Sequence, residues 1–529
     1  MICYCMFSKF STKTLLAPAI FFVSIFAYYY PVLQKGYAPG ANYEALMGAR
    51  NFALAGTYKV ENSIGTLLAS ENASQFGAEK GILNPLTQII YGRIFKYLGF
   101  RPELPLYMSI VLFALFNVLI FLLSARLFGT VIGFVSGLAG AFMPTMTVGA
   151  IHGGFYEWGI IFFGLALWVY LGAKNGPFKA GSVRVLVVSV FFALAALSRN
   201  AFAISFVPFF LYDLLINRSY KRALIFLLPF LIIFGSTLTS YSWLGVPNGY
   251  TADIERQSFG LIGHFFPDPY TFYYNRDNFV ITMKERGLIG PAVLFATKWG
   301  YRVSLFEMAG AYWNSFSFYV KEAVNLTSTG GPFILGLMLL GLINLYRLNK
   351  KILGLFVSWG IIWFGYLVYA KTGNWDHLME VVLIFSILVS LGLAYLAEII
   401  GMGTLKKTII SLIIFILFAG HMAYANKWRL HDIYRSSNEE EVLNIAKTLS
   451  RQNRTEAVYA IGIHPNAPYS LNYRTDYEVV YFDSETIKEL ITNKKLKTVF
   501  DAYNIGSVLG YGEETTKQIK SQVPVQSIP

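Results

Sequence analysis

The sequence predicts an all-α polytopic membrane protein that ends in a small α/β domain. Of its 529 residues 55% are hydrophobic and only 14% are charged, and its mean hydropathy is +0.49. A soluble chain carries roughly a quarter charged residues. Apolar runs of about 17 to 25 residues, each long enough to cross a bilayer, recur along this chain. Because only helices and closed barrels satisfy backbone polar groups in lipid, these runs predict membrane-spanning helices.

Eleven apolar runs are predicted to cross the membrane. In chain order they lie at about 15–33, 105–123, 130–148, 156–172, 185–197, 201–216, 223–243, 332–346, 352–370, 379–399 and 408–425. Basic residues gather in every second short loop: Arg126; Lys174, Lys179 and Arg184; Arg218, Lys221 and Arg222; Arg347, Lys350 and Lys351; and Lys406 with Lys407. By the positive-inside rule, these loops place the N-terminus inside and the C-terminus outside.

The ends of the chain and its charge limit the remaining possibilities. The basic N-terminus and its apolar run resemble a signal peptide, but the run is long and has no clear cleavage site, which predicts an uncleaved span. Cys3 and Cys5 precede this span and cannot form a disulfide framework for outer domains. The net charge of +13 is spread over short loops rather than gathered on one soluble face, so we predict no nucleic-acid partner.

Two long outer loops and a polar tail are predicted to lie on the outer side. The loops span 34–104 and 244–331 within a membrane domain of residues 1–425, and the tail is an extracytoplasmic domain of residues 426–529. In the tail, SNEEEVLNIAKTLSRQ and SETIKELITNKK have capped helix patterns. EAVYAIGI and YEVVYF read as strands, and AYNIGSVLGY as a turn leading into a third.

Ionisable side chains beside the spans are candidates for function, because placing them in lipid is costly. On the predicted outer side they include Glu44 and Arg50 in the first loop, Glu157, Arg199, Lys298 with Arg302, and Asp376 with His377. A partly desolvated carboxylate can deprotonate a hydroxyl acceptor. Arginine and lysine can neutralise a phosphate leaving group. A site of both kinds would suit group transfer from a lipid phosphate.

The order of several sequence segments along the chain is similar to the order found in one class of membrane enzymes. They are NYEALMGARNFALAGTY at 42–58, NPLTQIIYGRIFKYLGF at 84–100, SARLFG at 124–129, FYEWGIIFFGLAL at 155–167, ALAALSRNAFAISFVPFFL at 193–211 and the loop holding His377. The chain resembles GT-C fold glycosyltransferases, in particular the protein O-mannosyltransferase and aminoarabinose-transferase-like group. This resemblance implies transfer of a hexose or pentose, with inversion, from a polyprenyl-phosphate donor to a lipid, glycan or protein acceptor on the outer face of the plasma (inner) membrane.

The first loop departs from that group at one point. Its members usually place an Asp, often Asp-Glu, just before the Tyr of the first-loop helix, where it acts as catalytic base. Residues 38–42 here read Ala-Pro-Gly-Ala-Asn, and the first loop contains no Asp. Glu44, directly after Tyr43, is the nearest substitute, and Glu79 is another. The third possibility is a chain that has lost or changed the reaction.

These considerations predict a set of site residues. Glu44 and Glu157 are predicted to be catalytic, and the predicted substrate-binding residues are Tyr43, Arg50, Asn84, Arg199, Lys298, Arg302, Asp376 and His377. Each also has a plainer interpretation: Glu44 suits the dipole of a helix start, and Arg50 could extend toward lipid headgroups. No His, Cys or Asp pair has metal-ligand spacing, so we predict no metal and no other cofactor.

Three other classes of function remain open alternatives. A transporter or lipid flippase usually shows internal repeats with broken helices at mid-depth, and no convincing repeat is found here. A polysaccharide polymerase or ligase tends to carry its large outer loop late in the chain. An inactive GT-C-like scaffold is compatible with the missing Asp.

Overall fold

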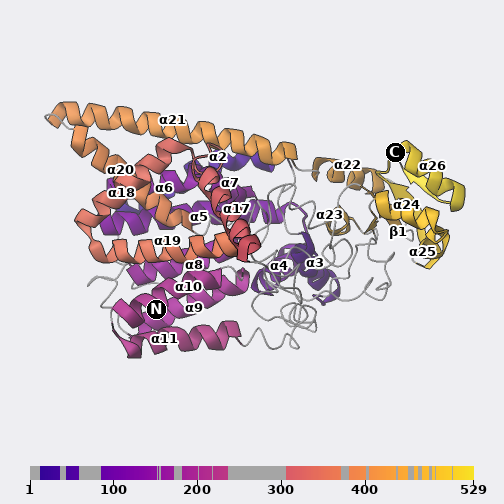
Figure 1. Cartoon of the computed structure of the whole chain (residues 1–529), viewed down its shortest axis with the longest axis horizontal. Coiled ribbons are helices and arrows are strands. Elements are labelled where there is room, and N and C mark those ends of the chain that lie inside the picture. Colours follow the sequence, from indigo (N-terminus) through magenta and orange to yellow (C-terminus); the bar gives the residue numbers. More distant parts are fainter. Residues whose placement is uncertain are drawn as a thin grey trace. The chain divides into compact units, whose positions relative to one another are not determined.

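The computed structural model describes most of the chain and divides it into two compact units. The described residues are 12–35, 43–58, 85–151, 153, 156–171, 182–199, 202–216, 218–235, 305–370, 381–400, 404–436, 439–450, 458–462, 467–475, 479–482, 484–502 and 504–528. The first unit contains the apolar helices, and the second contains the described parts of 37–105 together with 436–529. Figure 1 shows the elements with their labels.

The first unit is a bundle of apolar helices. Its elements are α2 (Thr12–Leu33), α5 (Leu104–Phe128), α6 (Thr130–Phe142), α7 (Pro144–Ile151), α8 (Tyr156–Leu171), α9 (Ser182–Ser198), α10 (Phe202–Leu211), the π-helical turn η4 (Tyr212–Ile216), α11 (Tyr220–Phe230), the π-helical turn η5 (Leu231–Gly235), α17 (Leu305–Ala323), α18 (Pro332–Leu348), α19 (Lys350–Ala370), α20 (Val382–Ile400) and α21 (Thr404–Ser436). Within the described residues, each predicted span therefore overlaps a helix or a consecutive pair of helical segments.

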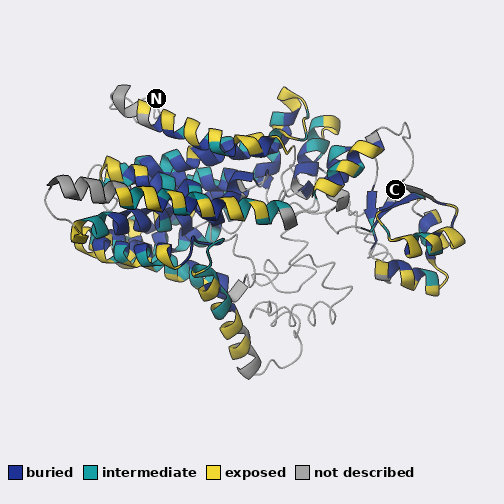
Figure 2. Ribbon diagram, turned by 90° about the horizontal axis from the view of Figure 1, so that it is seen from above, coloured by how far each residue is buried: buried dark blue, intermediate teal, exposed yellow. Residues whose placement is uncertain are grey.

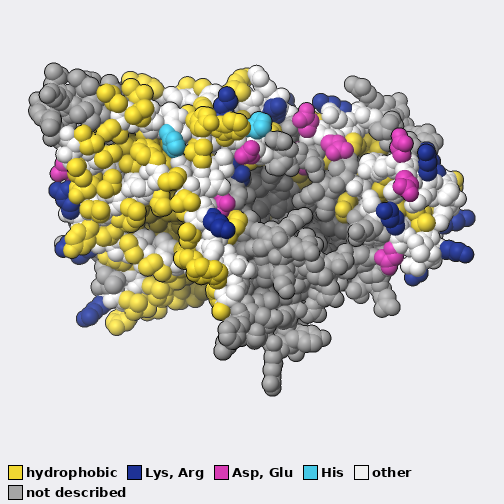
Figure 3. Space-filling view, turned by 45° about the horizontal axis from the view of Figure 1, so that its top comes forward, with side chains coloured by type: hydrophobic (Ala, Val, Ile, Leu, Met, Phe, Trp, Pro, Cys, Tyr) yellow, Lys and Arg dark blue, Asp and Glu magenta, His cyan; other side chains and the backbone are white. Residues whose placement is uncertain are grey.

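Within the described residues, three helices are long and apolar enough to cross a membrane by themselves. They are α5, α19 as far as Val368, and α20; the bent pair α6 and α7 makes a fourth if it counts as one span. The chain is thus a helical membrane protein, whereas the number of spans and their orientation stay predictions. Large apolar side chains such as Val131, Ile232 and Ile361 are exposed on the outside of the bundle, as lipid contact requires (Figures 2 and 3).

The third predicted span, residues 130–148, was expected to be one continuous helix, but it consists of two helices, α6 and α7. The axes of α6 and α7 differ by 65°, and the break is at Met143 and Pro144. Proline lacks the N–H that continues the helical ladder, and it disfavours the helical conformation of the residue before it. Met143 is accordingly extended, with φ −63° and ψ 125°. The backbone N–H of Thr145, next to the break, donates instead to the carbonyl of Ser328 at 2.9 Å.

Close helix contacts and one polar network hold the bundle together. α18 and α20 approach so tightly that a Cβ on Gly341 would overlap the carbonyl of Leu388. Small residues allow such approach in membrane helices. Buried Asn426 on α21 accepts a hydrogen bond from the Tyr28 hydroxyl at 3.0 Å and donates to the Tyr29 hydroxyl at 3.1 Å. This network ties α21 to the first span.

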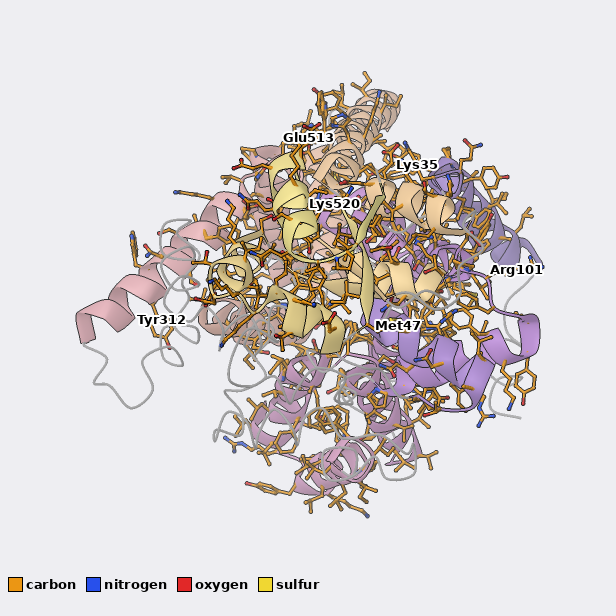
Figure 4. All side chains as sticks on the ribbon, turned by 90° about the vertical axis from the view of Figure 1, so that its right-hand side faces the viewer. Lys35, Met47, Arg101, Tyr312, Glu513 and Lys520 are labelled. Carbon is orange, nitrogen blue, oxygen red and sulfur yellow. The ribbon has the colours of Figure 1, made fainter. Side chains whose placement is uncertain are left out.

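The second unit combines two first-loop helices with the C-terminal α/β domain. The first-loop helices are α3 (Tyr43–Ala55) and α4 (Pro85–Leu98). The C-terminal elements are α22 (Glu439–Ser450), β1 (Val458–Ile461), α23 (Ala467–Arg474), β2 (Val479–Tyr481), α24 (Ser484–Thr492), α25 (Leu496–Ala502), β3 (Ile505–Leu509), α26 (Glu513–Gln522) and β4 (Gln526–Ile528). In Figure 4, Met47 marks α3, and Glu513 and Lys520 mark α26.

The C-terminal sheet is parallel and covered by helices on both faces. Its strand order is β2-β1-β3-β4, with Ala460 opposite both Val480 and Val508. These three side chains join one buried cluster with residues of α24, α25 and α26. Ile461 joins a second cluster with residues of α22 and α23. Burial on both faces explains why the inner strand β1 and its neighbour β2 are apolar throughout, as is usual for parallel sheets.

Candidate functional site

Glu157 lies in the first turn of α8, in the interior of the helical unit. Only 2% of its surface is exposed. Its carboxylate accepts a hydrogen bond from the Ser109 hydroxyl of α5 at 2.7 Å, and Ser109 in turn accepts the Gly153 backbone N–H at 2.8 Å. A negative charge suits the N-terminal end of a helix dipole. The carboxylate is therefore held by Ser109 of α5, which is itself held by the backbone just before α8, and the roles predicted for Glu157 stay predictions.

Arg199 directly follows the end of α9 and is equally buried, at 3% exposure. Its backbone closes the turn between helices: the Arg199 N–H donates to the Ala195 carbonyl, and the Phe202 N–H donates to the Arg199 carbonyl at 3.0 Å. A guanidinium in an apolar bundle requires anionic or polar partners. Arg199 is thus fixed by the link between α9 and α10.

Glu157 and Arg199 lie at the same end of the α8–α9 pair. The two helices run antiparallel: Gly159 in the first turn of α8 lies against Ala195 near the end of α9, whereas the later Phe162 ring lies against the earlier Phe191 ring, with centroids 6.5 Å apart. Gly159, two residues after Glu157, lies against the Phe202 ring, and a Cβ there would overlap it. A buried carboxylate and a buried guanidinium at one end of a bundle can bind a hydroxyl and a phosphate, respectively.

Two further predicted residues lie on first-loop helix α3, in the second unit. Tyr43 begins α3 and is buried, and its hydroxyl accepts a hydrogen bond from Arg474 Nη2 at 2.7 Å. Burial raises the pKa of Tyr43 above its ordinary range, so the phenol stays protonated at neutral pH. Arg50 is partly buried, with its guanidinium over the Phe100 ring at 5.3 Å. Their substrate-binding roles stay predictions.

The remaining predicted site residues are only partly open to description. Glu44 is in the first turn of α3, but its side chain lies outside the described part of the structure. The residues Asn84, Lys298, Arg302, Asp376 and His377 lie wholly outside it. In the parts of the chain that are described, no three His, Cys, Asp or Glu side chains gather where they could hold a metal ion. The absence of a metal requirement remains a prediction.

Two polar clusters were missed by sequence reasoning. In the second unit, Glu439 accepts a hydrogen bond from the Ser470 hydroxyl at 2.7 Å, next to Tyr43 and Arg474. In the first unit, fully buried Asp213 lies 3.2 Å from Arg222 Nη2 and 3.4 Å from the Tyr170 hydroxyl. A lone Asp in the apolar run 201–216 was a signal for the second cluster. Nothing in the spacing pointed to the first.

The Asp213 cluster has a structural interpretation. Asp213 lies in the π-helical turn η4, and its backbone carbonyl accepts the Ser219 N–H at 3.1 Å. The ion pair with Arg222 spans the connection between α10 and α11. Removing one member of a buried pair leaves an uncompensated charge, so the two side chains support each other. We assign this cluster to closing the helix pair and not to the candidate site.

Comparison with solved structures found proteins of the same overall architecture. The crystal structure of ArnT from Cupriavidus metallidurans bound to undecaprenyl phosphate matches over 98% of this chain and 90% of that chain, with a TM-score of 0.53 and 11% identity. Archaeal oligosaccharyltransferase AglB from Archaeoglobus fulgidus, in complex with an inhibitory peptide and a dolichol-phosphate, matches over 88% of this chain and 68% of that chain, with a TM-score of 0.47 and 11% identity. No protein-family model and no curated protein sequence matches the chain. The resemblance inferred from the first-loop and span motifs is therefore confirmed at the level of architecture, and the chain has the GT-C fold.

Proposed function

We propose that this protein is a membrane glycosyltransferase that moves a sugar from a polyprenyl-phosphate donor to a hydroxyl acceptor. The observation that carries the proposal is the likeness of nearly the whole chain to ArnT, whose structure contains undecaprenyl phosphate. Buried Glu157 and Arg199 at one end of an apolar bundle support it, since such a pair can contact a sugar hydroxyl and a lipid phosphate. The basic short loops favour an active site on the outer face of the plasma membrane.

The proposed reaction is a single displacement at the sugar carbon. The acceptor oxygen forms a bond to this carbon while the bond between the carbon and the phosphate oxygen breaks. The acceptor proton goes to a carboxylate, for which Glu44 is our candidate, and the polyprenyl phosphate leaves with the bonding electron pair. Arg199 is proposed to stabilise the leaving phosphate, and Glu157 to bind the sugar. Lys298, Arg302, Asp376 and His377 remain candidates for donor or acceptor contacts.

Mass spectrometry of surface glycans and glycolipids tests the proposal most simply. We expect at least one glycosylated species to disappear when the gene is disrupted and to return with the wild-type gene. Glu44→Gln should lower this species about 100-fold or more, because a general base contributes that much to rate. Glu513→Gln, at an exposed position of α26, is the matched control and should restore the wild-type level.

Two outcomes of this experiment would contradict different parts of the proposal. If no glycosylated species changes on disruption, the chain is not a glycosyltransferase in its host, and an inactive scaffold becomes the better account. If Glu44→Gln restores the species fully while the protein is present in the membrane, another carboxylate such as Glu79 takes the proton, and only the assignment of Glu44 falls.

A further inference from the structure

The C-terminal domain reaches the start of the first-loop helix through a chain of polar contacts. Arg474, the last residue of α23, donates from Nη2 to the Tyr43 hydroxyl oxygen at 2.7 Å. The Tyr43 hydroxyl also donates a hydrogen bond to the carboxylate of Glu439, the first residue of α22. Ser470 donates to the same carboxylate at 2.7 Å. We call Tyr43, Glu439, Ser470 and Arg474 the α3 clamp.

Aromatic packing around the α3 clamp restricts how its members move. The Arg474 guanidinium lies over the Tyr43 ring at 5.3 Å, so this arginine contacts both the hydroxyl and the ring face. The Tyr43 and Tyr473 ring centroids are 5.5 Å apart. Tyr473 also meets the Phe100 ring edge-on at 5.2 Å, just beyond α4. Helix α23 is therefore packed against both first-loop helices.

The packing of α3 on α4 leaves little freedom for α3 to rotate. A Cβ on Gly48 of α3 would stand 2.6 Å from Oε1 of Gln88 on α4, so the two helices are in close contact there. The α3 clamp holds the first residue of α3, and the Gly48 contact holds its middle. Two fixed points on a rigid helix determine its orientation about its own axis.

The residue that follows Tyr43 is the carboxylate that the proposed reaction needs. Residue 44 follows Tyr43 in the first turn of α3, so fixing Tyr43 fixes the helical backbone that carries residue 44. Here the anchoring of α3 comes from residues more than 390 positions away in the sequence.

From these contacts we infer that Arg474 and Glu439 are positioning residues, which act through Tyr43 to hold the first turn of α3, and with it the backbone of Glu44, in place for the transfer reaction. The inference rests on the proposed function and adds a role for the C-terminal domain within it. A misplacement of a reacting group by about 1 Å can lower a rate roughly 100-fold, so the loss of such an anchor is measurable. The α3 clamp gives the C-terminal domain a part in catalysis without contact to substrate.

The test compares Arg474→Met and Arg474→Lys with Lys497→Met, an exposed lysine of α25 in the same domain. Each full-length variant is expressed in the disrupted host, and the glycosylated species that depends on the wild-type gene is quantified per molecule of protein. The affinity of the purified protein for undecaprenyl phosphate is also measured, to show whether the binding of the donor lipid is affected. A variant with Tyr43→Phe separates the hydroxyl contact from ring packing.

We expect Arg474→Met and Tyr43→Phe to lower the glycosylated species about ten-fold or more while undecaprenyl phosphate binding stays within about two-fold. Arg474→Lys should recover part of the lost product because it keeps a donor, and Lys497→Met should match the wild type. Full product from Arg474→Met would overturn the inference, as would equal losses of product, lipid binding and thermal stability, since these indicate a purely structural role. If no species depends on the wild-type gene, the proposed function itself fails first.

Discussion

At the scale of single residues, the buried carboxylate of Glu157 is our first candidate for contact with substrate. Its carboxylate accepts a hydrogen bond from Ser109 and is shielded from bulk water by burial. If Glu157 only stabilises the fold, substituting it should lower stability; if it contacts substrate, substituting it should lower activity. Glutamine keeps the shape and an acceptor oxygen for Ser109 but removes the negative charge.

Glu157→Gln should therefore separate the two roles. We expect the glycosylated species to fall about ten-fold or more, because hydrogen bonds to a charged group are worth roughly 1.5–3 kcal/mol. Thermal stability of the purified protein should change little, whereas Glu157→Ala, which leaves the Ser109 hydroxyl without its acceptor, should lower stability by about 1–3 kcal/mol. A fully active Glu157→Gln protein would leave Glu157 with a structural role only.

Glu439 gives a prediction for pH dependence. Burial raises the pKa of this carboxyl above its ordinary value, against the opposing effects of Ser470 and Arg474. The folded state thus binds this proton more tightly than the unfolded state does. The stability from this group is present in full below the ordinary carboxyl range and is lost as pH rises through the raised pKa.

Glu439→Gln should remove this part of the pH dependence. We expect the stability of the wild type relative to Glu439→Gln to fall as the pH rises from about 4 through the raised pKa of Glu439. Thermal unfolding of both proteins in the same detergent, at matched ionic strength, measures the difference. A difference that stays constant or grows with pH over this window contradicts the assignment.

At the scale of elements, the sequence located helices well and their contacts poorly. Where the structure describes them, the predicted spans overlap helical segments because the apolar runs are long, and the predicted strands near 458 and 479 coincide with β1 and β2. The helices α23, α25 and α26 and the strand β4 were missed, since segments of three to ten residues carry little periodic pattern. The break at Pro144 was also missed, although the proline was visible in the sequence.

The contact of α18 with α20 offers an element-scale prediction with an internal control. A Cβ on Gly392 would overlap the carbonyl of Leu337, whereas a Cβ on Gly336 of α18 meets no atom within 4 Å. Gly392→Ala should destabilise the protein by about 1–3 kcal/mol or more, because overpacking forces the helices apart. Gly336→Ala should be neutral or stabilising by up to about 1 kcal/mol, since alanine is the better helix former.

Thermal unfolding in detergent distinguishes the two glycine variants. Both add a single methyl group in an apolar helix, so differences in hydrophobicity do not account for a difference in stability. If Gly336→Ala lowers the melting temperature as much as Gly392→Ala does, the close approach of α18 and α20 is not what limits the substitution.

At the scale of the whole molecule, the sequence predicted the architecture better than the site. Composition and run length predicted a polytopic helical membrane protein. The resemblance in loop order and motifs implied the GT-C fold, which the structural likeness to ArnT confirms. The site residues depend on contacts between distant segments. Tyr43 and Arg474 are separated by 431 positions, and no local pattern of either segment specifies their pairing. The sequence alone showed that the first loop lacks the Asp that the resembled group places before this Tyr. The structure was needed to show that the α3 clamp surrounds Tyr43 at the start of α3.

The central claim is that the chain transfers a sugar from a polyprenyl phosphate, and release of the lipid phosphate measures it directly. Purified full-length protein is incubated with cell-envelope material from the disrupted host, which supplies lipid, glycan and protein acceptors, and free polyprenyl phosphate and the glycosylated product are both quantified by mass spectrometry. The account predicts that both appear in equal molar amounts with the wild type and that Glu44→Gln suppresses both. No release of polyprenyl phosphate by the wild-type protein, or release without any glycosylated product, would contradict it.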